Sequence, residues 1–242
     1  MIMKRLKTFV LLVLTGVTAG YAQEVCTAQA EKEPTKFDQW FSAGWGLNGS
    51  MGANLYLGDV AEEPFSDLRA MINIGLQKEI TPWLYWRFNG AYGNLAGTKD
   101  EYKSGAPANL KFKTKYTEYN TSLKVDLFGF NDNLRAKKIA PYVYAGVGLI
   151  NLRSRLSDSE SGATKATFGY NGWVATSATH EVEVPFGLGA EWKVSKALSF
   201  TLDASMTLVK SDKLDACVSN YDDKFLEDMF STLSLGFVYK FG

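Results

Sequence analysis

The sequence predicts an all-β fold, namely an eight-stranded antiparallel up-and-down transmembrane β-barrel. Eight segments alternate apolar and polar residues with a period of two, as β-strands do when one face lies in an apolar medium. The connections between these segments alternate between short and long, which predicts neighbouring strands that run up and down. Aromatic residues make up 14% of the 242 residues and glycines number 22, a mixture that suits strands and tight turns better than helices.

The first residues have the pattern of a secretory signal peptide. A basic start that includes Lys4 precedes an apolar run from Phe9 to Val17, and the small residues Gly20 and Ala22 follow at a cleavage site. No later stretch of about 18 apolar residues occurs, so we expect no membrane-spanning helix. The expected organisation is a signal peptide at 1–22, a periplasmic N-terminal tail at 23–37 and an outer-membrane β-barrel at 38–242.

The segment HEVEVPFGLGAEWKV, residues 180–194, has the clearest alternation. Every second residue from Val182 to Val194 is apolar, and the residues between them are charged or lack a large apolar group. Strict period two predicts a strand with one face in an apolar medium. In chain order, the eight predicted strands are 41–51, 68–77, 84–93, 118–127, 142–149, 180–194, 198–208 and 232–241.

Short and long connections are expected at opposite ends of the barrel. The short ones are ITPW (80–83), NDNLRAKK (131–138) and SKA (195–197). The long ones are predicted loops near 58–67, 95–113, 153–179 and 210–227. With an even number of up-and-down strands, the termini share the short-turn end.

The apolar medium is either lipid outside the barrel or a ligand inside it. A soluble lipocalin-like barrel would turn its apolar residues inward, whereas an outer-membrane barrel turns them outward and fills its lumen with polar residues. The polar residues here are mostly Gly, Ser and Asn with mixed charges, which suits an eight-stranded lumen filled by side chains better than a solvent face. The predicted luminal ion-pair network is Arg87, Lys124, Asp126, Glu183, Glu191, Asp203 and Lys240.

Two further features favour lipid. Tryptophans stand near the strand ends at the short-turn side, where an interfacial aromatic girdle belongs; they are Trp40, Trp83, Trp86 and Trp192. The last strand carries the aromatic series Phe237, Tyr239 and Phe241, a common close of outer-membrane barrels. We therefore expect the protein in the outer membrane after signal-peptide cleavage, with lipid as its partner.

The whole mature pattern resembles the small eight-stranded outer-membrane barrels of the OmpA-like type. More narrowly, YLGD (56–59), PYVYAGVGL (141–149), PFGLGAEW (185–192) and LDACVSNYDD (214–223) resemble segments of the PorG-type barrel component of type IX secretion. The last segment departs from that family's spacing by about one residue and adds Cys217. The resemblance implies a non-enzymatic structural or assembly component of an envelope machine, with periplasmic protein partners.

The basic turn LRAKK and the tail are the features available for such contacts. The candidate contact residues of the turn are Arg135, Lys137 and Lys138. The alternatives are an OmpA-like structural protein or surface adhesin that works through its long loops, a small-solute channel, and a soluble exported lipocalin-like binder. A filled lumen argues against a wide pore. The formal net charge is zero, so no overall basic footprint for nucleic acid exists.

No catalytic or cofactor-binding constellation is predicted, so we do not expect an enzyme. The single histidine, His180, stands where a loop enters a strand and is interpreted as a rim residue. Glu183 and Glu191 lie on one strand about 25 Å apart, too far to act on one bond as an acid–base pair. The carboxylates of the last long loop match no known calcium-loop spacing and are interpreted as solvated.

The two cysteines are not expected to pair with each other. Cys26 belongs to the tail at the short-turn end, and Cys217 belongs to a loop at the other end. An apolar belt about 25 Å tall separates the two ends, whereas bridged Cα atoms lie about 6 Å apart.

Overall fold

A computed structural model describes residues 43–57, 67–101, 107–171, 174–175, 178–210, 214, 216 and 228–241. All of them belong to the compact unit Trp40–Gly242. The predictions for the signal peptide, the tail, Trp40 and the two cysteines lie outside the described residues.

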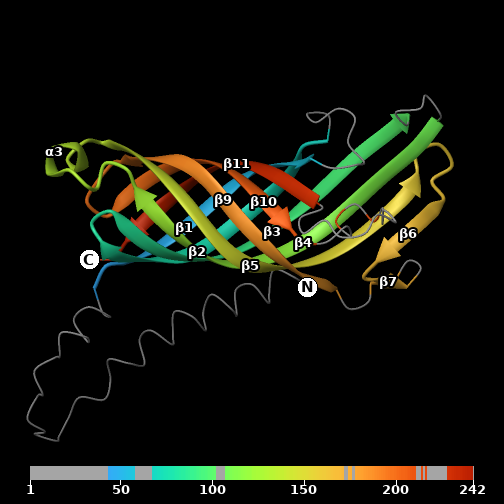
Figure 1. The fold of residues 1–242 in the computed structure, drawn as a ribbon, viewed down its shortest axis with the longest axis horizontal. Helices are drawn as coiled ribbons and strands as arrows, with labels where there is room; N and C mark the ends of the chain where they lie inside the picture. The colour runs from blue at the N-terminus through green and yellow to red at the C-terminus, as the bar shows by residue number, and fades with distance from the viewer. Residues whose placement is uncertain are drawn as a thin grey trace, which may run out of the picture. The chain divides into compact units, whose positions relative to one another are not determined.

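Eight strands close into an antiparallel barrel, which confirms the predicted fold (Figure 1). They are β1 (Trp45–Leu57), β2 (Arg69–Thr81), β3 (Leu84–Glu101), β4 (Pro107–Asp126), β5 (Ile139–Asp158), β9 (Thr179–Lys193), β10 (Leu198–Val209) and β11 (Asp228–Lys240). Each strand pairs with its neighbours in the chain, and β11 pairs with β1 to close the ring. All eight predicted strands are present.

Smaller elements decorate the two ends of the barrel. At the long-loop end, β6 (Thr164–Phe168) pairs with the outer part of β5, and β7 (Tyr170–Asn171) pairs with β8 (Val174–Ala175). At the short-turn end, the helix α3 (Asp132–Arg135) forms the connection between β4 and β5. Figure 1 shows α3 and the C-terminus at one end and β6 and β7 at the other.

The exterior of the barrel carries an apolar belt, as the alternation predicts. Met51, Ile74, Leu188 and Leu235 are 67%, 64%, 62% and 64% exposed. Their chain neighbours on the opposite face of each strand point into the barrel. Because such large side chains are exposed all round the wall, the belt fits a lipid environment and not water.

Two of the predicted long loops are largely strand, which corrects the sequence interpretation. β3 continues to Glu101 and β4 begins at Pro107, so most of 95–113 is hairpin; β5 continues to Asp158, inside the loop expected at 153–179. Period two persists there, but the faces exchange polarity. In β4 the apolar residues are Tyr119 and Leu123 at exposed odd positions, then Leu110 and Phe112 at buried even positions. The sequence interpretation followed a single apolar face, so it ended each strand at the height where that face no longer contacts lipid.

The inward apolar residues of these extensions form a hydrophobic cluster at the long-loop end of the barrel. Tyr56 and Phe112 meet edge to face with ring centroids 4.6 Å apart, and Tyr116 and Phe230 lie 5.4 Å apart. The other members are Leu95, Ala108, Leu110, Ile150, Leu152, Leu156, Val209, Leu214 and Ala216. Where the outside of the barrel is no longer apolar, its inside is packed as an ordinary protein core.

Leu188→Arg is expected to destabilise the protein by about 2–4 kcal/mol in a bilayer, because Leu188 lies in the apolar belt. Gly187→Ala is the inward control, since a Cβ there would lie 2.6 Å from the carbonyl oxygen of Ala204. Denaturant unfolding in lipid vesicles and in detergent micelles measures both variants. The arginine should cost more in the bilayer, whereas the alanine should cost the same in both. An arginine variant as stable as the parent in vesicles would contradict the lipid assignment.

Phe112→Ala is expected to lower the free energy of unfolding by about 3–5 kcal/mol, because Phe112 is fully buried against Tyr56. The neighbouring exposed residue supplies the control: Lys113→Ala should change stability by less than about 0.5 kcal/mol. Equilibrium unfolding in urea compares the two. Equal, small effects would mean that the long-loop end has no packed core.

Candidate functional site: the polar lumen and the short-turn mouth

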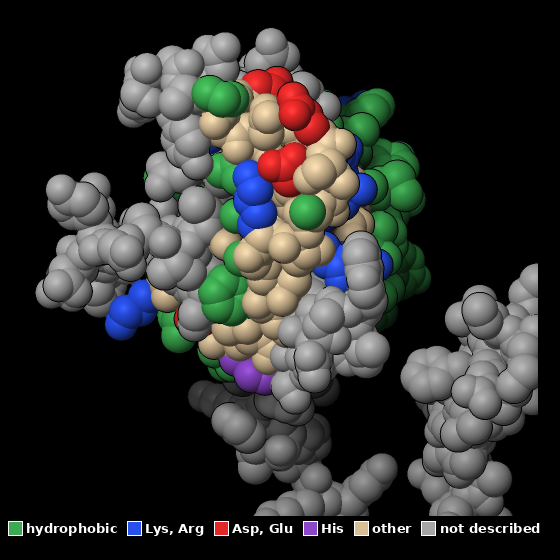
Figure 2. Space-filling model, turned by 90° about the vertical axis from the view of Figure 1, so that its right-hand side faces the viewer, with side chains coloured by type: hydrophobic (Ala, Val, Ile, Leu, Met, Phe, Trp, Pro, Cys, Tyr) green, Lys and Arg blue, Asp and Glu red, His purple; other side chains and the backbone are tan. Residues whose placement is uncertain are grey.

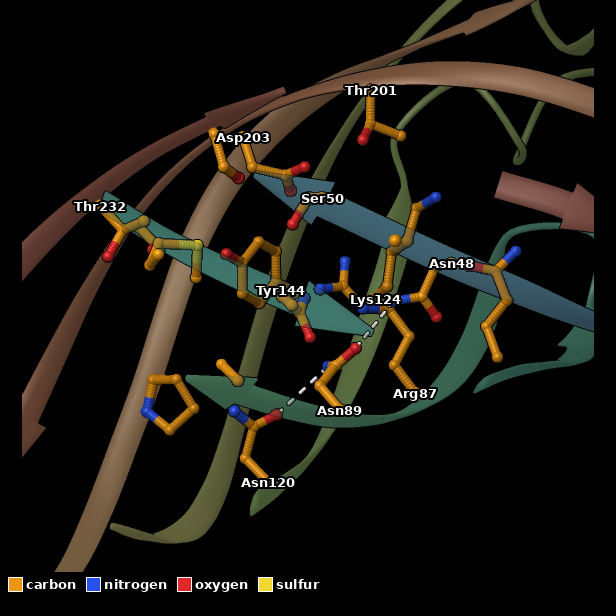
Figure 3. A pocket seen from close by; sticks show the side chains of 18 of the residues that line it. Asn48, Ser50, Arg87, Asn89, Asn120, Lys124, Tyr144, Thr201, Asp203 and Thr232 are labelled. Atoms are coloured by element: carbon orange, nitrogen blue, oxygen red, sulfur yellow. Dashed lines mark hydrogen bonds between the residues drawn. The ribbon is translucent and has the colours of Figure 1, made fainter. Parts of the chain in front are cut away.

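A row of amides crosses the middle of the lumen from β1 through β3 to β4 (Figure 3). Asn48 Nδ2 donates to Asn89 Oδ1 at 2.9 Å, and Asn89 Nδ2 donates to Asn120 Oδ1 at 3.2 Å. Asn120 in turn donates to the carboxylate of Glu118. Each of these three amides is thereby bonded to another luminal group, although Asn48 Oδ1 has no hydrogen-bond partner among the described residues.

A buried ion pair lies on the short-turn side of this row. Lys124 Nζ and Glu191 Oε2 are 2.5 Å apart, and the two side chains are only 2% and 7% exposed. The same ammonium lies over the ring of Tyr142 at 4.2 Å and over that of Tyr85 at 5.2 Å. A charge pair so enclosed depends on both partners, because either one alone would be a buried, uncompensated charge.

Arg87 and Asp203 face the same small cavity from opposite strands (Figure 3). The guanidinium of Arg87 lies over the Tyr144 ring at 4.5 Å, and the Tyr142 hydroxyl donates to Asp203 Oδ1 at 2.6 Å. The cavity has a volume of about 70 Å³. That is space for a few waters and not for an organic solute.

Two of the predicted luminal charges lie at the short-turn mouth. Asp126 is 3.8 Å from Lys193, and its Oδ1 accepts the backbone N–H of Phe128 at 2.9 Å. Lys240 is 3.6 Å from Glu79. The predicted luminal charges are therefore spread over two levels and do not form a single continuous network.

Glu183 does not meet the cations that we expected to pair with it. Its side chain is fully buried beside the carboxyl group of Glu118, and neither Glu183 oxygen has a hydrogen-bond partner within the described part of the chain. Gly148 lies between Asn120 and Glu183 in the strand register. The alternation placed Glu118 on the inward face at the start of the predicted strand 118–127, but Glu118 was not among the predicted luminal charges. Since β4 extends to Pro107, Glu118 lies in mid-strand.

The short-turn mouth holds a basic groove of about 370 Å³. Its charged lining residues are Arg135, Lys193, Lys196, Lys240 and Glu79. They come from α3, from the β9–β10 turn and from the ends of β2, β9 and β11, which the up-and-down topology brings together. Of the four cations, Arg135 was predicted as a contact residue and Lys240 as a luminal charge, but Lys193 and Lys196 were not placed at this mouth, although the turn SKA offered Lys196 as a basic residue at the same end.

The helix α3 fixes the position of Arg135 in the groove. The side chain of Asn131 caps the helix by accepting the N–H of Asn133 at 2.9 Å, and Arg135 pairs with Asp132 at 3.1 Å. The two other predicted contact residues lie nearby: Lys137 stands over the Phe128 ring at 5.5 Å, and Lys138 is exposed.

The remaining chemistry-bearing residues form no catalytic or metal-binding constellation in the described ranges. His180 is exposed at the long-loop end, where its Nδ1 is hydrogen-bonded to Asn151 Oδ1. No group of three His, Cys, Asp or Glu residues able to hold a metal ion occurs among the described residues. None of the described helices is long and apolar enough to cross a membrane.

Solved structures with a similar fold include outer-membrane proteins. Neisserial surface protein A is 13% identical, with a TM-score of 0.50, and the match covers 82% of this chain and 98% of that chain. A major outer membrane protein from Thermus thermophilus is 15% identical, with a TM-score of 0.49, over 82% of this chain and 100% of that chain. At 13% identity the likeness to the Neisserial protein shows the barrel fold alone.

No functionally curated protein matches the chain, so no specific activity is carried over from a relative. Residues 9–241 match the family described as the outer membrane protein beta-barrel domain. That match spans most of the signal-like start and every strand of the barrel. The apolar belt, the polar lumen and this match together show that the chain belongs to the family of outer-membrane β-barrel proteins.

Proposed function

We propose that the protein is a non-enzymatic structural or assembly component of an envelope machine and that it works through its short-turn face. In outer-membrane barrels the short turns face the periplasm. The observation that carries the proposal is the basic groove at that mouth. The type IX secretion apparatus, in which PorG-type barrels act, is the specific machine that we propose.

The groove offers more positive charge than its own acids neutralise. Arg135 pairs with Asp132 at 3.1 Å, whereas Glu79 lies 3.6 Å from Lys240 and Asp126 lies 3.8 Å from Lys193, and both of these distances are too long for a direct hydrogen bond. Lys196 forms no ion pair with a described residue. An acidic segment of a periplasmic protein is the partner that this surplus would attract.

The scaffold of the groove is suited to holding a partner in register. The backbone N–H of Lys193 donates to the carbonyl of Lys138 at 2.7 Å, and Lys193 Nζ donates to the carbonyl of Arg135 at 3.2 Å. These bonds join the β4–β5 connection to the end of β9. A contact surface whose turns are already joined by hydrogen bonds loses little conformational entropy when it binds a partner.

The interior of the barrel argues against transport and catalysis. The buried Lys124–Glu191 pair, the amide row and the hydrophobic cluster fill it from one end to the other. The one histidine is exposed outside the lumen and bonded to an asparagine. An occluded lumen, with no catalytic constellation among the residues that the structure describes, supports a structural role.

A surface adhesin is the second candidate, and the extended hairpins favour it. β3, β4 and β5 run well beyond the apolar belt and pack a core of their own there. Such a rigid projection at the long-loop end is suited to contacts outside the cell. The two candidates use opposite ends of the same barrel, so variants at each end separate them.

The protein is expected to show small or no conductance in planar bilayers, because the lumen is plugged by Arg87, Lys124 and Glu191. Lys124→Met should also lower the free energy of unfolding by about 3–5 kcal/mol, because it leaves the carboxylate of Glu191 buried without its ion-pair partner. Exposed Lys113→Met on the same strand is the control. Large, stable single-channel steps from the parent protein would support the channel function instead.

Replacing Arg135, Lys193 and Lys196 with Gln is expected to impair cargo secretion to the cell surface. Three charge contacts at or near the surface, of about 0.5 kcal/mol each, correspond to a roughly tenfold weaker complex with the periplasmic partner. Cargo is quantified on intact cells, and co-purification from detergent-solubilised membranes measures the complex.

The control grafts Gly-Ser sequence over 158–177 at the opposite end, which should leave secretion intact. Loss of function from this graft alone would favour the adhesin. Normal secretion in both variants would remove the envelope-machine proposal.

A further inference from the structure

Two carboxyl groups meet inside the barrel where the polar lumen adjoins the hydrophobic cluster. Glu118 is on β4 and Glu183 is on β9, the two strands that pair with opposite edges of β5. Gly148 of β5 lies between them, since it pairs with Asn120 on one side and with Glu183 on the other. A Cβ at Gly148 would lie 2.5 Å from Glu183 Oε1. The missing side chain of this glycine therefore makes the space in which the two carboxyl groups come together.

Glu183 lacks the partners that a carboxylate needs. Its side chain is fully buried and that of Glu118 is 7% exposed. Asn120 donates to the carboxyl group of Glu118, but neither oxygen of Glu183 has a hydrogen-bond partner in the part of the chain that the structure describes. A buried ionised carboxylate without such partners is strongly unfavourable.

The acids on the outside of the long-loop end have a different environment. Figure 2, which views this end, shows red Asp and Glu side chains at the surface with blue Lys and Arg side chains near them. Asp158 pairs with Lys165 at 3.0 Å, and Asp67 pairs with Arg69 at 2.9 Å. Cations and water stabilise the ionised form of these surface acids.

The cations nearest the buried carboxyl pair are engaged elsewhere. Lys124 pairs with Glu191 at 2.5 Å, and the guanidinium of Arg87 lies over the ring of Tyr144 at 4.5 Å. The other charged or titratable groups on the inward faces of the neighbouring strands also have partners of their own; they are Arg69, Tyr116, Glu181, Asp203 and Asp228. None of these cations forms an ion pair with Glu118 or Glu183, so two negative charges at the pair would be unbalanced.

The row of amides shows which of the two carboxyl groups accepts. Asn48 donates to Asn89, Asn89 donates to Asn120, and Asn120 donates to Glu118, so the row ends on an acceptor. A metal ion between the carboxyl groups would attract the oxygen of Asn120, because hard cations bind oxygen ligands. The amide instead directs its N–H toward Glu118. This direction favours an ionised Glu118 and a proton on Glu183.

We propose that Glu118 and Glu183 hold one proton between them, with Glu183 as donor and Glu118 as acceptor, and that loss of this proton loosens the long-loop end of the barrel. With the proton in place, the Glu183 hydroxyl forms a charge-assisted hydrogen bond to Glu118. Without it, two buried negative charges repel each other across β5, next to the hydrophobic cluster. The inference does not depend on the proposed periplasmic function.

The proposal fixes the sign of the pH dependence. In the unfolded chain both carboxyl groups are ionised above about pH 5. The folded protein then holds one proton more than the unfolded chain, so stability falls as the pH rises until the folded pair releases its proton. In that range, this pair lowers the ratio of folded to unfolded protein by up to about tenfold per pH unit.

The test is urea unfolding of the full-length protein in lipid vesicles between about pH 5 and about pH 9. Glu183→Gln keeps an N–H donor next to Glu118 without a titratable proton, and Glu118→Gln keeps an acceptor for Asn120. Both variants are expected to lose less stability than the parent as the pH rises. Glu160 is exposed in the β5–β6 turn, so Glu160→Gln is the matched control and should retain the pH dependence of the parent.

Infrared spectroscopy observes the proton itself. At neutral pH the parent should show the carbonyl stretch of a protonated carboxyl group, and Glu183→Gln should lack it. The same pH dependence in the parent and in both Gln variants at the pair, or the absence of this band from the parent, would overturn the proposal. Stabilisation of the parent by Ca²⁺ at alkaline pH that both of these variants lose would also overturn it, in favour of a bound cation.

Discussion

The absence of hydrogen-bond partners in lipid is the constraint on which the rest of this structure depends. Every backbone N–H and C=O within the hydrocarbon must be bonded inside the protein, and a closed sheet is the only strand arrangement that achieves this. The pairing of β11 with β1 closes the ring here. Closure with eight strands fixes a narrow bore, and the bore in turn fixes what the inward residues can be.

The narrow bore explains the small inward residues and the compact polar packing. A Cβ at Gly52 would lie 2.3 Å from the carbonyl oxygen of Leu233, and one at Gly146 equally close to that of Thr121. Space saved at such positions is taken by the larger groups, above all Lys124, Glu191 and Tyr142. Glu118 and Glu183 are the exception to this pairing of opposite charges, since two carboxyl groups side by side repel each other unless a proton or a cation lies between them.

The sequence pattern was sufficient to predict the parts of the strands that lie in lipid. It was insufficient where the strands continue beyond the apolar belt. From residue 118 onward in β4, the apolar odd positions marked the strand and its exposed face correctly. From 107 to 116 the strand continues, but Leu110 and Phe112 are apolar at even positions, so the same search interpreted it as loop. The luminal residues followed from parity alone, as Lys124 and Glu191 demonstrate. The partners of these residues could not be predicted in this way, because the neighbour of Glu183 depends on the strand register and on the conformation of its side chain.

The convergence of Lys193, Lys196 and Lys240 with Arg135 was beyond sequence reasoning for a similar reason. Alternating loop lengths predict that their turns share an end, but not which side chains line one groove. Which side chains line one groove depends on the position of each strand in the barrel, and that position is set by backbone pairing far from the turns. The same pairing places Lys113 opposite Arg155 at the other end.

A sealed barrel has only its wall and its two ends with which to act. The wall of this protein is apolar and meets lipid, and its lumen is occupied by its own side chains, so specific recognition falls to the ends. The chain has 26 basic and 26 acidic residues, so the basic groove at the short-turn mouth reflects segregation of charge and not an overall surplus. Segregated charge at a membrane boundary resists movement along the membrane normal, since a displaced lysine would enter the hydrocarbon at a cost of about 2–4 kcal/mol at the midplane. The cations of the basic groove therefore hold the short-turn end of the barrel at the membrane boundary.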